Sequence, residues 1–279
     1  IEHFGYSLEA EVSSLFSRAN LGSSSKGAIG DIRDLNNLSR FLGQINPSVV
    51  VHLAAQPLVL KSYEEPLETF QTNCIGTANL LEAAFQTPSV KVILVITTDK
   101  VYRNENTGSR FKENDPLEGK DPYSASKSAA EMGITAWQNL ASNQGDKRIV
   151  SARAGNVVGG GDFSENRIIP DLVRGHLNNQ TVSIRNPEST RPWMHVLDTL
   201  RGYLDAIQMT DKLDSHTVYN FSPEGKSLSV LEIVEIALDR WPNMFEYNIE
   251  RSKDNLKEAR LLSLDSSKAR KELDWKCSW

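Results

Sequence analysis

The chain is poor in cysteine and contains no long apolar run. Its two cysteines, Cys74 and Cys277, lie far apart in sequence and form no CxxC pair. This spacing indicates neither a disulfide framework nor a zinc site, so we expect no metal centre and a cytoplasmic protein. No apolar run approaches the roughly 18 residues of a membrane-spanning helix, so we expect no membrane partner.

Charge and glycine spacing show two further absences. The net charge of −5 offers no electrostatic attraction to nucleic acid. A dinucleotide-binding fold normally opens with a strand, a glycine-rich turn and a helix that receives the pyrophosphate. The glycines of the first 50 residues, at positions 5, 22, 27, 30 and 43, do not have the spacing of that turn. The rest of the composition, 39% hydrophobic and 24% charged, is typical of a globular protein.

The apolar run from Val92 to Ile96 predicts a parallel strand that is buried on both faces. Thr97, Thr98, Asp99 and Lys100 follow at its carboxyl end. Ligands of open α/β sheets bind at that edge. We therefore expect an active site here.

A helix is predicted from Tyr123 to Asn139, with Asp121 and Pro122 as its start signals. Tyr123 and Lys127 are four residues apart, so they share one helix face. A nearby ammonium lowers the pKa of a tyrosine from its usual value of about 10, which predicts that Tyr123 acts as a base. A tyrosine and a lysine at this spacing can also be a surface pair, but the hydroxyls and charges after Ile96 favour the active site.

Two more strand ends are candidate ligand contacts. The run from Val49 to Ala55 predicts another buried strand, within which His52 is best explained as a core residue. The strand from Ile149 to Val158 contains Asn156 and runs into three glycines, whose bare backbone could wrap a diphosphate. A flexible turn is the alternative for these glycines. We favour the ligand role because the strand ends at the binding edge.

The fold class predicted from these runs is α/β, with a doubly wound, mostly parallel sheet and a smaller mixed α/β domain. The pattern changes beyond residue 160, where shorter helices and strands alternate. Arg167, Arg185 and Arg191 are candidate phosphate ligands in that region because arginine binds phosphate in a bidentate manner. Each of them could equally be a solvated or structural arginine.

Five motifs in a fixed order resemble those of the extended short-chain dehydrogenase/reductase family. The resemblance is narrower to the CDP-glucose 4,6-dehydratases, because the chain has HLAAQPLV, Lys100 after Asp99, NRIIPD and IRNPESTRPWMHVL. The motifs are HLAAQ (His52 to Gln56), TTDKVY (Thr97 to Tyr102), YSASK (Tyr123 to Lys127), RAGNVVGGGD (Arg153 to Asp162) and RPWMHVLD (Arg191 to Asp198).

The resemblance covers nearly the whole chain, to about Trp275, and implies two domains. Residues 1–160 correspond to a Rossmann-like dinucleotide-binding domain, and residues 161–279 mainly to a sugar-nucleotide-binding domain. Ile1 to Leu8 matches the second strand of the family, and the family continues beyond Trp279. We therefore expect an internal fragment of a longer protein, without the first βα unit and the C-terminal end.

The family resemblance implies NAD as the cofactor and assigns roles to individual residues. Asp31 and Ile32 would face the adenine, although an aspartate there or at position 34 is also a typical helix N-cap. The other implied cofactor contacts are Ala54, Ala55, Gln56, Tyr123 and Lys127, and the implied substrate contacts are Asn156, Arg167, Arg185 and Arg191.

The implied reaction is dehydration of a nucleotide-activated hexose, CDP-D-glucose, to a 4-keto-6-deoxy sugar. Tyr123 would take the C4 hydroxyl proton while Thr98 holds that oxygen. Asp99 would protonate the departing C6 hydroxyl and Lys100 would remove the C5 proton, with Lys127 completing the catalytic set. Because Asp99 and Lys100 are adjacent and need opposite pKa shifts, a shared proton, a water or enolate stabilisation by Lys100 are alternatives.

The expected partners are a nucleotide sugar and, for the intact protein, a second copy of the chain in a homodimer. Three other functions remain open. A sugar-nucleotide 4-epimerase would use Tyr123 and Lys127 without the Asp99–Lys100 pair. A nucleotide-binding module would keep the fold without catalysis, and a fragment without the first βα unit could be inert.

Overall fold

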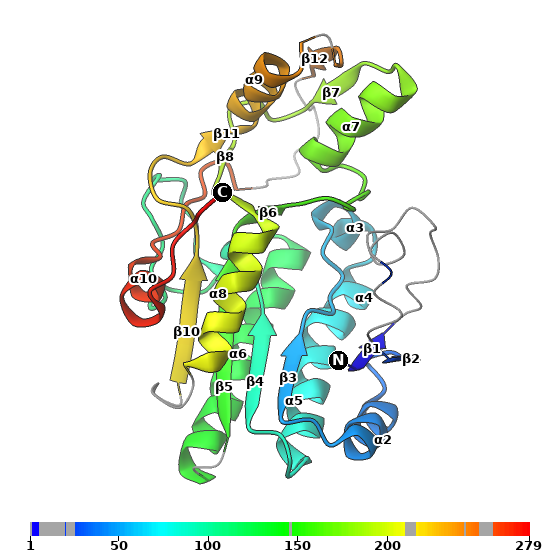
Figure 1. Cartoon of the computed structure of the whole chain (residues 1–279), viewed down its shortest axis with the longest axis vertical. Coiled ribbons are helices and arrows are strands. Elements are labelled where there is room, and N and C mark those ends of the chain that lie inside the picture. Colours follow the sequence, from blue (N-terminus) through cyan, green and yellow to red (C-terminus); the bar gives the residue numbers. More distant parts are fainter. Residues whose placement is uncertain are drawn as a thin grey trace.

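The computed structural model describes residues 2–5, 20, 26–144, 147–209, 216–242, 244–250 and 259–279. Its centre is a four-stranded parallel sheet in the order β10-β5-β4-β3. All four strands point their carboxyl ends toward the smaller upper domain (Figure 1). The strands are β3 (Val49–His52), β4 (Val92–Ile96), β5 (Arg148–Ala154) and β10 (His216–Phe221).

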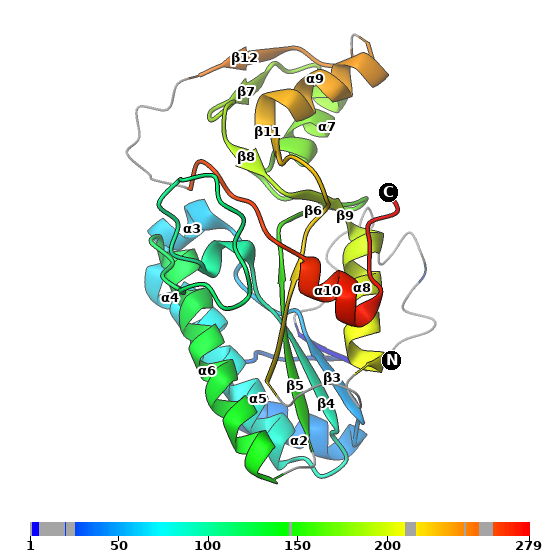
Figure 2. The ribbon, with the colours of Figure 1, turned by 90° about the vertical axis from the view of Figure 1, so that its left-hand side faces the viewer.

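Helices cover both faces of this sheet, which confirms the predicted α/β fold. Helices α5 and α6 lie on one face and α8 and α10 on the other (Figure 2). Helix α6 begins one residue before the helix predicted from Tyr123 to Asn139 and continues past the predicted end, to Gln144. The bounds are α5 (Gly76–Gln86), α6 (Pro122–Gln144), α8 (Val196–Gln208) and α10 (Ser267–Leu273).

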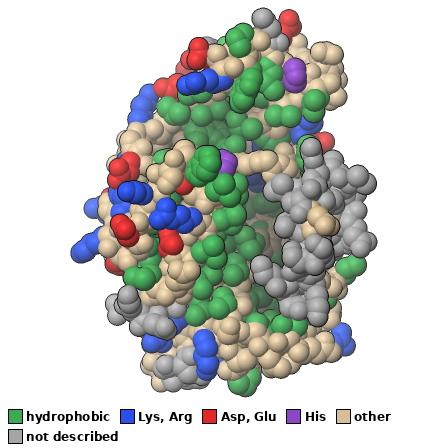
Figure 3. Space-filling view, viewed as in Figure 1, with side chains coloured by type: hydrophobic (Ala, Val, Ile, Leu, Met, Phe, Trp, Pro, Cys, Tyr) green, Lys and Arg blue, Asp and Glu red, His purple; other side chains and the backbone are tan. Residues whose placement is uncertain are grey.

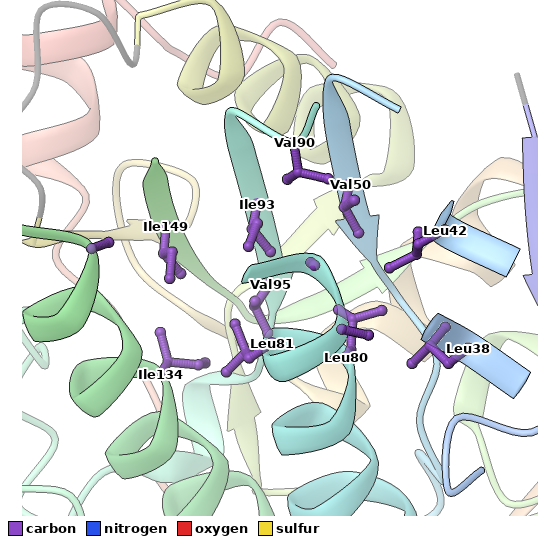
Figure 4. Close-up of a cluster of buried hydrophobic side chains, with 13 residues drawn as sticks. Leu38, Leu42, Val50, Leu80, Leu81, Val90, Ile93, Val95, Ile134 and Ile149 are labelled. Atoms are coloured by element: carbon purple, nitrogen blue, oxygen red, sulfur yellow. The ribbon is translucent and has the colours of Figure 1, made fainter. Parts of the chain in front are cut away.

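Strand β4 is the centre of the hydrophobic core. Successive side chains of a strand point to opposite faces, and Ile93 and Val95 pack on the side of α5 and α6, against Leu81 and Ile134 (Figure 4). Leu94 belongs to the cluster on the opposite face. The predicted burial of β4 on both faces is therefore correct, and this burial holds the carboxyl end of β4 in a fixed position.

Strand β3 departs from its prediction, because only one of its faces is buried. Val50 and His52 are buried, whereas Val49 is 38% and Val51 43% exposed. The reason is the position of α8, which packs on β4 and β5. Apolar side chains gather along the middle of this face of the molecule, over α8 (Figure 3).

The first strands form a separate small sheet. β1 (Glu2–Gly5) pairs in parallel with β2 (Lys26–Ile29). No ladder between described residues joins this pair to the larger sheet. Helix α2 (Leu35–Ile45) follows and is capped by Asp34, whose side chain accepts a hydrogen bond from the Asn37 backbone. Phe4 packs on Phe41 of that helix with a ring-centroid distance of 4.9 Å.

The upper domain has its own core around Leu172, Ile184 and Val234. The predicted domain boundary near residue 160 stays a prediction. Three elements from beyond it belong to the larger domain, because β10 is a strand of the large sheet and α8 and α10 pack on that sheet. The upper elements are α7 (Ile168–Asn178), β7 (Val182–Ile184), β8 (Thr190–Arg191), β11 (Leu228–Ser229), α9 (Val230–Arg240) and β12 (Tyr247–Ile249).

A small two-stranded sheet lies between the large sheet and the upper domain, where β6 (Asn156–Val158) pairs in parallel with β9 (Trp193–His195). Within the larger part, helices α3 (Val59–Glu64) and α4 (Pro66–Phe70) and a π-helical turn (Gln71–Ile75) connect β3 to α5. Within the described ranges, no helix is both long and apolar enough to cross a membrane.

Candidate functional site

The carboxyl end of β4 carries the predicted catalytic residues on a short 3-10 turn, Asp99–Val101. Thr98 and Asp99 are buried, at 7% and 1% exposure. The Thr98 hydroxyl donates to Asp99 Oδ1 at 3.0 Å and accepts from the Lys100 backbone N–H at 3.4 Å. These bonds hold a hydroxyl and a carboxyl group together beside the end of the strand.

Lys100 points to a different side of this turn. It is half-buried and lines a pocket of about 140 Å³ together with Glu118, Asp121 and Ser124. The pocket lies under the loop of residues 102–120 and beside residues 259–262. Lys100 therefore lines a pocket next to the start of α6.

The first turn of α6 is fixed from two directions, which positions Tyr123. Asp121 caps the helix by accepting hydrogen bonds from the Ser124 backbone and hydroxyl, at 2.9 and 2.6 Å. The Tyr123 backbone N–H donates to the Ser62 hydroxyl of α3 at 3.1 Å. These two anchors fix the first turn of α6, and the Tyr123 phenol lies close enough to Thr98 and Asp99 for both to shift its pKa.

The predicted lowering of the Tyr123 pKa is wrong for this structure. Burial raises the pKa of Tyr123 to about 12, the hydrogen bond from Thr98 partly opposes this, and the carboxylate of Asp99 adds to it. Lys127 does not supply the expected cation, because its ammonium donates to the Ile96 carbonyl at 3.2 Å. The phenol is therefore protonated at neutral pH in the unliganded protein.

Lys127 and His52 are both buried beneath the strand ends. Burial lowers the pKa of Lys127 to about 8, and the Glu131 carboxylate opposes this shift. Burial, helped by the charge of Lys127, lowers the pKa of His52 to about 3. The His52 Nε2 lies 3.0 Å from the Thr77 hydroxyl, so His52 is the satisfied core residue that the sequence predicts.

The loop after β3 places small residues at the carboxyl edge of the large sheet. Gln56, which was predicted to contact the cofactor, holds this loop in place. Ala54 and Ala55 are half-buried. Gln56 donates from its backbone to Asn73 Oδ1 at 2.8 Å and from its side chain to Thr69 Oγ1 at 2.8 Å. Its amide is thus engaged within the protein, because Asn73 and Thr69 of the adjacent helical segment hold the loop.

The two predicted adenine contacts are also engaged in local structure. The Asp31 carboxylate accepts from Arg33 Nε at 2.9 Å, and Arg33 forms an ion pair with Glu68 at 2.6 Å. Ile32 is 6% exposed and packs against Gly76, where an added Cβ would lie 2.6 Å from its Cδ1. These contacts fix the loop before α2, so an adenine role for Asp31 and Ile32 stays a prediction.

The three predicted phosphate arginines are not brought together. Arg167 is 40% exposed, lies 3.8 Å from Asp162, and its charge lowers the pKa of Tyr123. Arg185 is exposed, and its charge acts on Asp171. Arg191 is 4% exposed, and its Nη1 donates to the carbonyls of Thr190 and Arg260. Of the three, Arg167 is the one whose charge acts on Tyr123.

Asn156 begins β6, and Gly159 and Gly161 follow it in the turn. An added Cβ at Gly159 would lie 2.5 Å from Val196, and Gly161 has φ +83°, so this turn requires glycine. The side chain of Asn156 is half-buried at the junction of the two parts. Its role as a substrate contact stays a prediction.

Sequence reasoning missed a buried polar network behind the site. Glu131 of α6 binds Arg153 of β5, and Arg153 also donates to the Tyr102 hydroxyl at 2.8 Å. The Tyr102 hydroxyl donates in turn to Asn220 Oδ1 at 2.7 Å. A signal was available, since Glu131 lies four residues after Lys127 on the predicted face of the helix.

Comparison with known proteins places these residues in a family context. The family model described as GDP-mannose 4,6 dehydratase matches residues 9–279. The CDP-glucose 4,6-dehydratase of Salmonella typhimurium is 40% identical over 99% of this chain and 79% of its own length. The structure of DesIV, a dTDP-glucose 4,6-dehydratase of Streptomyces venezuelae with NAD bound, is 25% identical, covers 94% of this chain and 79% of that one, and has a TM-score of 0.77.

A further solved structure shares the fold alone. The UDP-glucose 4-epimerase of Thermotoga maritima is 22% identical, covers 100% of this chain and 94% of its own, and has a TM-score of 0.80. The fold is therefore common to enzymes with different reactions, and the residues at the end of β4 must carry any distinction between them.

Proposed function

Because the chain belongs to the GDP-mannose 4,6-dehydratase family of extended short-chain dehydrogenases/reductases, we propose that it converts CDP-D-glucose to CDP-4-dehydro-6-deoxy-D-glucose, with NAD as cofactor. The reaction oxidises C4 of the hexose, eliminates water across C5 and C6, and returns the hydride to C6. The family assignment confirms the enzyme class expected from the sequence, a lyase. The cytidine base, the cytoplasmic location and the homodimer are parts of the proposal.

The observation that carries this proposal is the meeting of Thr98 and Asp99 with Tyr123. A hydroxyl, a carboxyl group and a phenol from two elements lie together at the end of β4, where ligands of such sheets bind. Epimerisation at C4 needs the phenol and the hydroxyl. Elimination of water also needs an acid and a base, which Asp99 and Lys100 supply.

Tyr123 accepts the proton of the C4 hydroxyl while Thr98 holds that oxygen. A phenol with a pKa of about 12 is a weak base at neutral pH, so the loaded site has to favour the phenolate. Arg167 is the cation of this chain that acts in that direction. Thr98 would act in the same way once its hydroxyl turns from Asp99 Oδ1 to the phenolate oxygen, because a donor to that oxygen stabilises it.

Asp99 protonates the departing C6 hydroxyl and Lys100 takes the C5 proton. The two residues are adjacent on the 3-10 turn, and their side chains have different surroundings. Asp99 is buried against Thr98, whereas Lys100 lines the adjoining pocket. The Lys100 base role has a direct check, which is solvent deuterium exchange at C5. A Lys100→Ala variant that still exchanges the C5 proton at the wild-type rate would overturn this role.

The donors at the strand ends fit the nicotinamide half of NAD. Tyr123 and Lys127 offer a hydroxyl and a buried ammonium there, and Ala54 and Ala55 are small enough for close approach of a ligand. A cofactor held by these four residues supplies reversible acceptance of a hydride. The Gln56 amide, engaged by Thr69, is left out of the set.

The experiment is to incubate the 279-residue chain with NAD and CDP-glucose, and to follow binding by calorimetry and product by mass spectrometry. We expect a product that has lost one water and carries a keto group, with one solvent deuterium at C5 in heavy water. Sugar inverted at C4 without loss of water would select the epimerase instead. Equal turnover of UDP- and dTDP-glucose would remove the cytidine assignment, and NAD binding without turnover would select a nucleotide-binding module.

The homodimer has a candidate face on the outer side of α4 and α6, which pack side by side (Figure 2). Leu67 is 71%, Ile75 53% and Met132 62% exposed there. Exposed apolar side chains on α4, on the π-helical turn after it and on α6 suit a two-fold dimer, in which each copy presents the same surface. We expect Met132→Lys to shift the molar mass from light scattering toward the monomer, while Ile236→Lys on α9 leaves it unchanged. Equal masses for both variants would contradict this face.

A further inference from the structure

Glu131 lies on the same face of α6 as Tyr123 and Lys127, at successive intervals of four residues. The exposure of the three side chains falls from 8% for Tyr123 to 4% for Lys127 and 1% for Glu131. A carboxylate so deeply buried is costly unless it is paired and hydrogen-bonded. Its position behind two catalytic residues raises the question of what it does for them.

Every donor around Glu131 comes from the two central strands. Its Oε1 accepts from Ser151 Oγ at 2.7 Å, from Arg153 Nε at 2.9 Å and from the Thr97 hydroxyl. Its Oε2 accepts from Arg153 Nη2 at 2.8 Å. The guanidinium thus binds both oxygens, and the clamp joins α6 to the residue just before Thr98.

These contacts keep Glu131 ionised. Burial alone would raise the pKa of Glu131, but the charge and hydrogen bonds of Arg153, with those of Ser151 and Thr97, hold it below its usual range. The carboxylate is therefore negative throughout neutral pH. It is the charge that opposes the loss of the Lys127 proton caused by burial.

The other groups around Lys127 do not replace this charge. His52, from β3, is neutral because of its burial. Asp99, after β4, acts on Tyr123. Arg153, from β5, is itself a cation and is bound to Glu131. Glu131 is thus the anion whose charge acts on the Lys127 ammonium among the described residues.

We propose that Glu131 is a positioning residue that acts through Lys127. Its carboxylate is the counter-charge that keeps the Lys127 ammonium protonated in a dry site, and its clamp on Thr97 and Arg153 holds that face of α6 against the strand that carries Thr98. This role deepens the proposed function and rests on it for its effect on catalysis. The charge on Lys127 itself can be measured without any turnover.

The first test is an NMR titration of the Lys127 side-chain nitrogen, whose signal is assigned by its loss in Lys127→Met. We expect the Lys127 pKa to fall from about 8 by a further unit or more in Glu131→Gln, which keeps the shape and removes the charge. Ser151→Ala is the matched control, because it removes one hydrogen bond to Glu131 and leaves the charge. An unchanged Lys127 pKa in Glu131→Gln would overturn the proposal.

Arg153 is left without its carboxylate in Glu131→Gln, so this variant can fail to fold. If Glu131→Gln does not fold, the double variant Glu131→Gln/Arg153→Met is titrated in its place. It removes both buried charges, so that no charge is left unpaired and Lys127 still lacks its anion. We expect the same lowered Lys127 pKa in the double variant. Arg153→Met alone removes the charge that helps to keep Glu131 ionised, so there the Lys127 pKa should fall only if Glu131 itself takes up a proton. A fall while Glu131 is still ionised would contradict the proposal.

The second test is the pH profile of kcat/KM with CDP-glucose. Loss of the Lys127 proton ends activity on the alkaline side, so we expect that limb to move to lower pH by the shift seen in the titration. Activity in Glu131→Gln relative to wild type should then be about fivefold lower at pH 8 than at pH 6 for a pKa shift of one unit, and lower still for a larger shift. An equal loss at both pH values would mean a purely structural role, and inactivity of the wild type would count against the proposed reaction while leaving the titration valid.

Discussion

The edge of the large sheet and the upper domain contribute to the site in different ways. At the sheet edge, Thr98, Asp99 and Tyr123 are buried, and a hydrogen bond joins Thr98 to Asp99 before any substrate arrives. In the upper domain, Arg185 is exposed and the Arg167 side chain is 40% exposed. The chemistry is thus preorganised, whereas the surface that would bind the diphosphate is incomplete without its ligand.

This difference follows from what surrounds each set. The end of β4 is held by a core on both faces and by the Glu131–Arg153 clamp, in which side-chain exposures are 1% and 4%. Arg167 stands at the start of α7 and forms a long ion pair with Asp162, at 3.8 Å. A few tenths of a kcal/mol hold such an exposed pair, so a ligand can rearrange it.

The largest effect is expected when the preorganised set loses its phenol. Tyr123→Phe should lower kcat about 1,000-fold, because general base catalysis typically contributes 10²–10⁴. Stability should change little, since the ring and its packing remain. Steady-state kinetics with CDP-glucose would measure this, and Tyr247→Phe on β12 is the control. A loss of less than tenfold would show that Tyr123 does not take the proton.

The sequence predicted this set well because its members are close together in the chain. Thr98, Asp99 and Lys100 follow one apolar run, and Tyr123 and Lys127 share one helix, so periodicity alone placed them. The family resemblance then assigned their roles. The pKa of Tyr123 was not predictable in the same way, because it depends on burial and on the direction in which Lys127 points.

Residues that depend on contacts between distant segments were beyond the sequence. Arg191, whose phosphate role stays a prediction, donates to a carbonyl 69 residues away, at Arg260. The backbone of Gln56, whose cofactor role also stays a prediction, is held by Asn73, 17 residues later. Neither partner is signalled by spacing or composition. The Glu131–Arg153 pair was missed although the spacing from Lys127 places Glu131 on the catalytic face of the helix, because its partner Arg153 lies on a different element.

The next largest effect should come from breaking that buried pair. Arg153→Met leaves the Glu131 carboxylate buried without its guanidinium, which we expect to cost about 3–5 kcal/mol of unfolding free energy. Urea unfolding would measure it. Arg103→Met is the matched control, since Arg103 and Glu118 form an ion pair at 54% and 49% exposure, and it should cost about 1 kcal/mol or less. Equal losses of unfolding free energy in the two variants would show that the buried Glu131–Arg153 pair stabilises the protein no more than an exposed ion pair does.

A smaller effect concerns pH, through His52 beneath the site. Its folded-state pKa of about 3 lies below the unfolded value near 6.5, so the unfolded chain binds a proton that the folded chain does not. Stability should therefore fall as the pH falls from 6.5 toward 3, by about 2 kcal/mol at pH 5. His52→Gln should remove this part of the pH dependence, while His176→Gln, at an exposed site, should keep it. Parallel curves for wild type and His52→Gln would contradict the assignment.

The smallest effect tests the upper domain, where the two exposed arginines differ in what they face. Arg167 acts on Tyr123, whereas Arg185 acts on Asp171. Arg167→Met should raise KM for CDP-glucose about tenfold, the loss of one charge-assisted contact, and Arg185→Met should raise it by less. Steady-state kinetics at constant ionic strength would compare the two. If Arg185→Met raises KM more than Arg167→Met does, substrate binding must move the upper domain. The upper domain would then not be preorganised in the way that the residues at the sheet edge are.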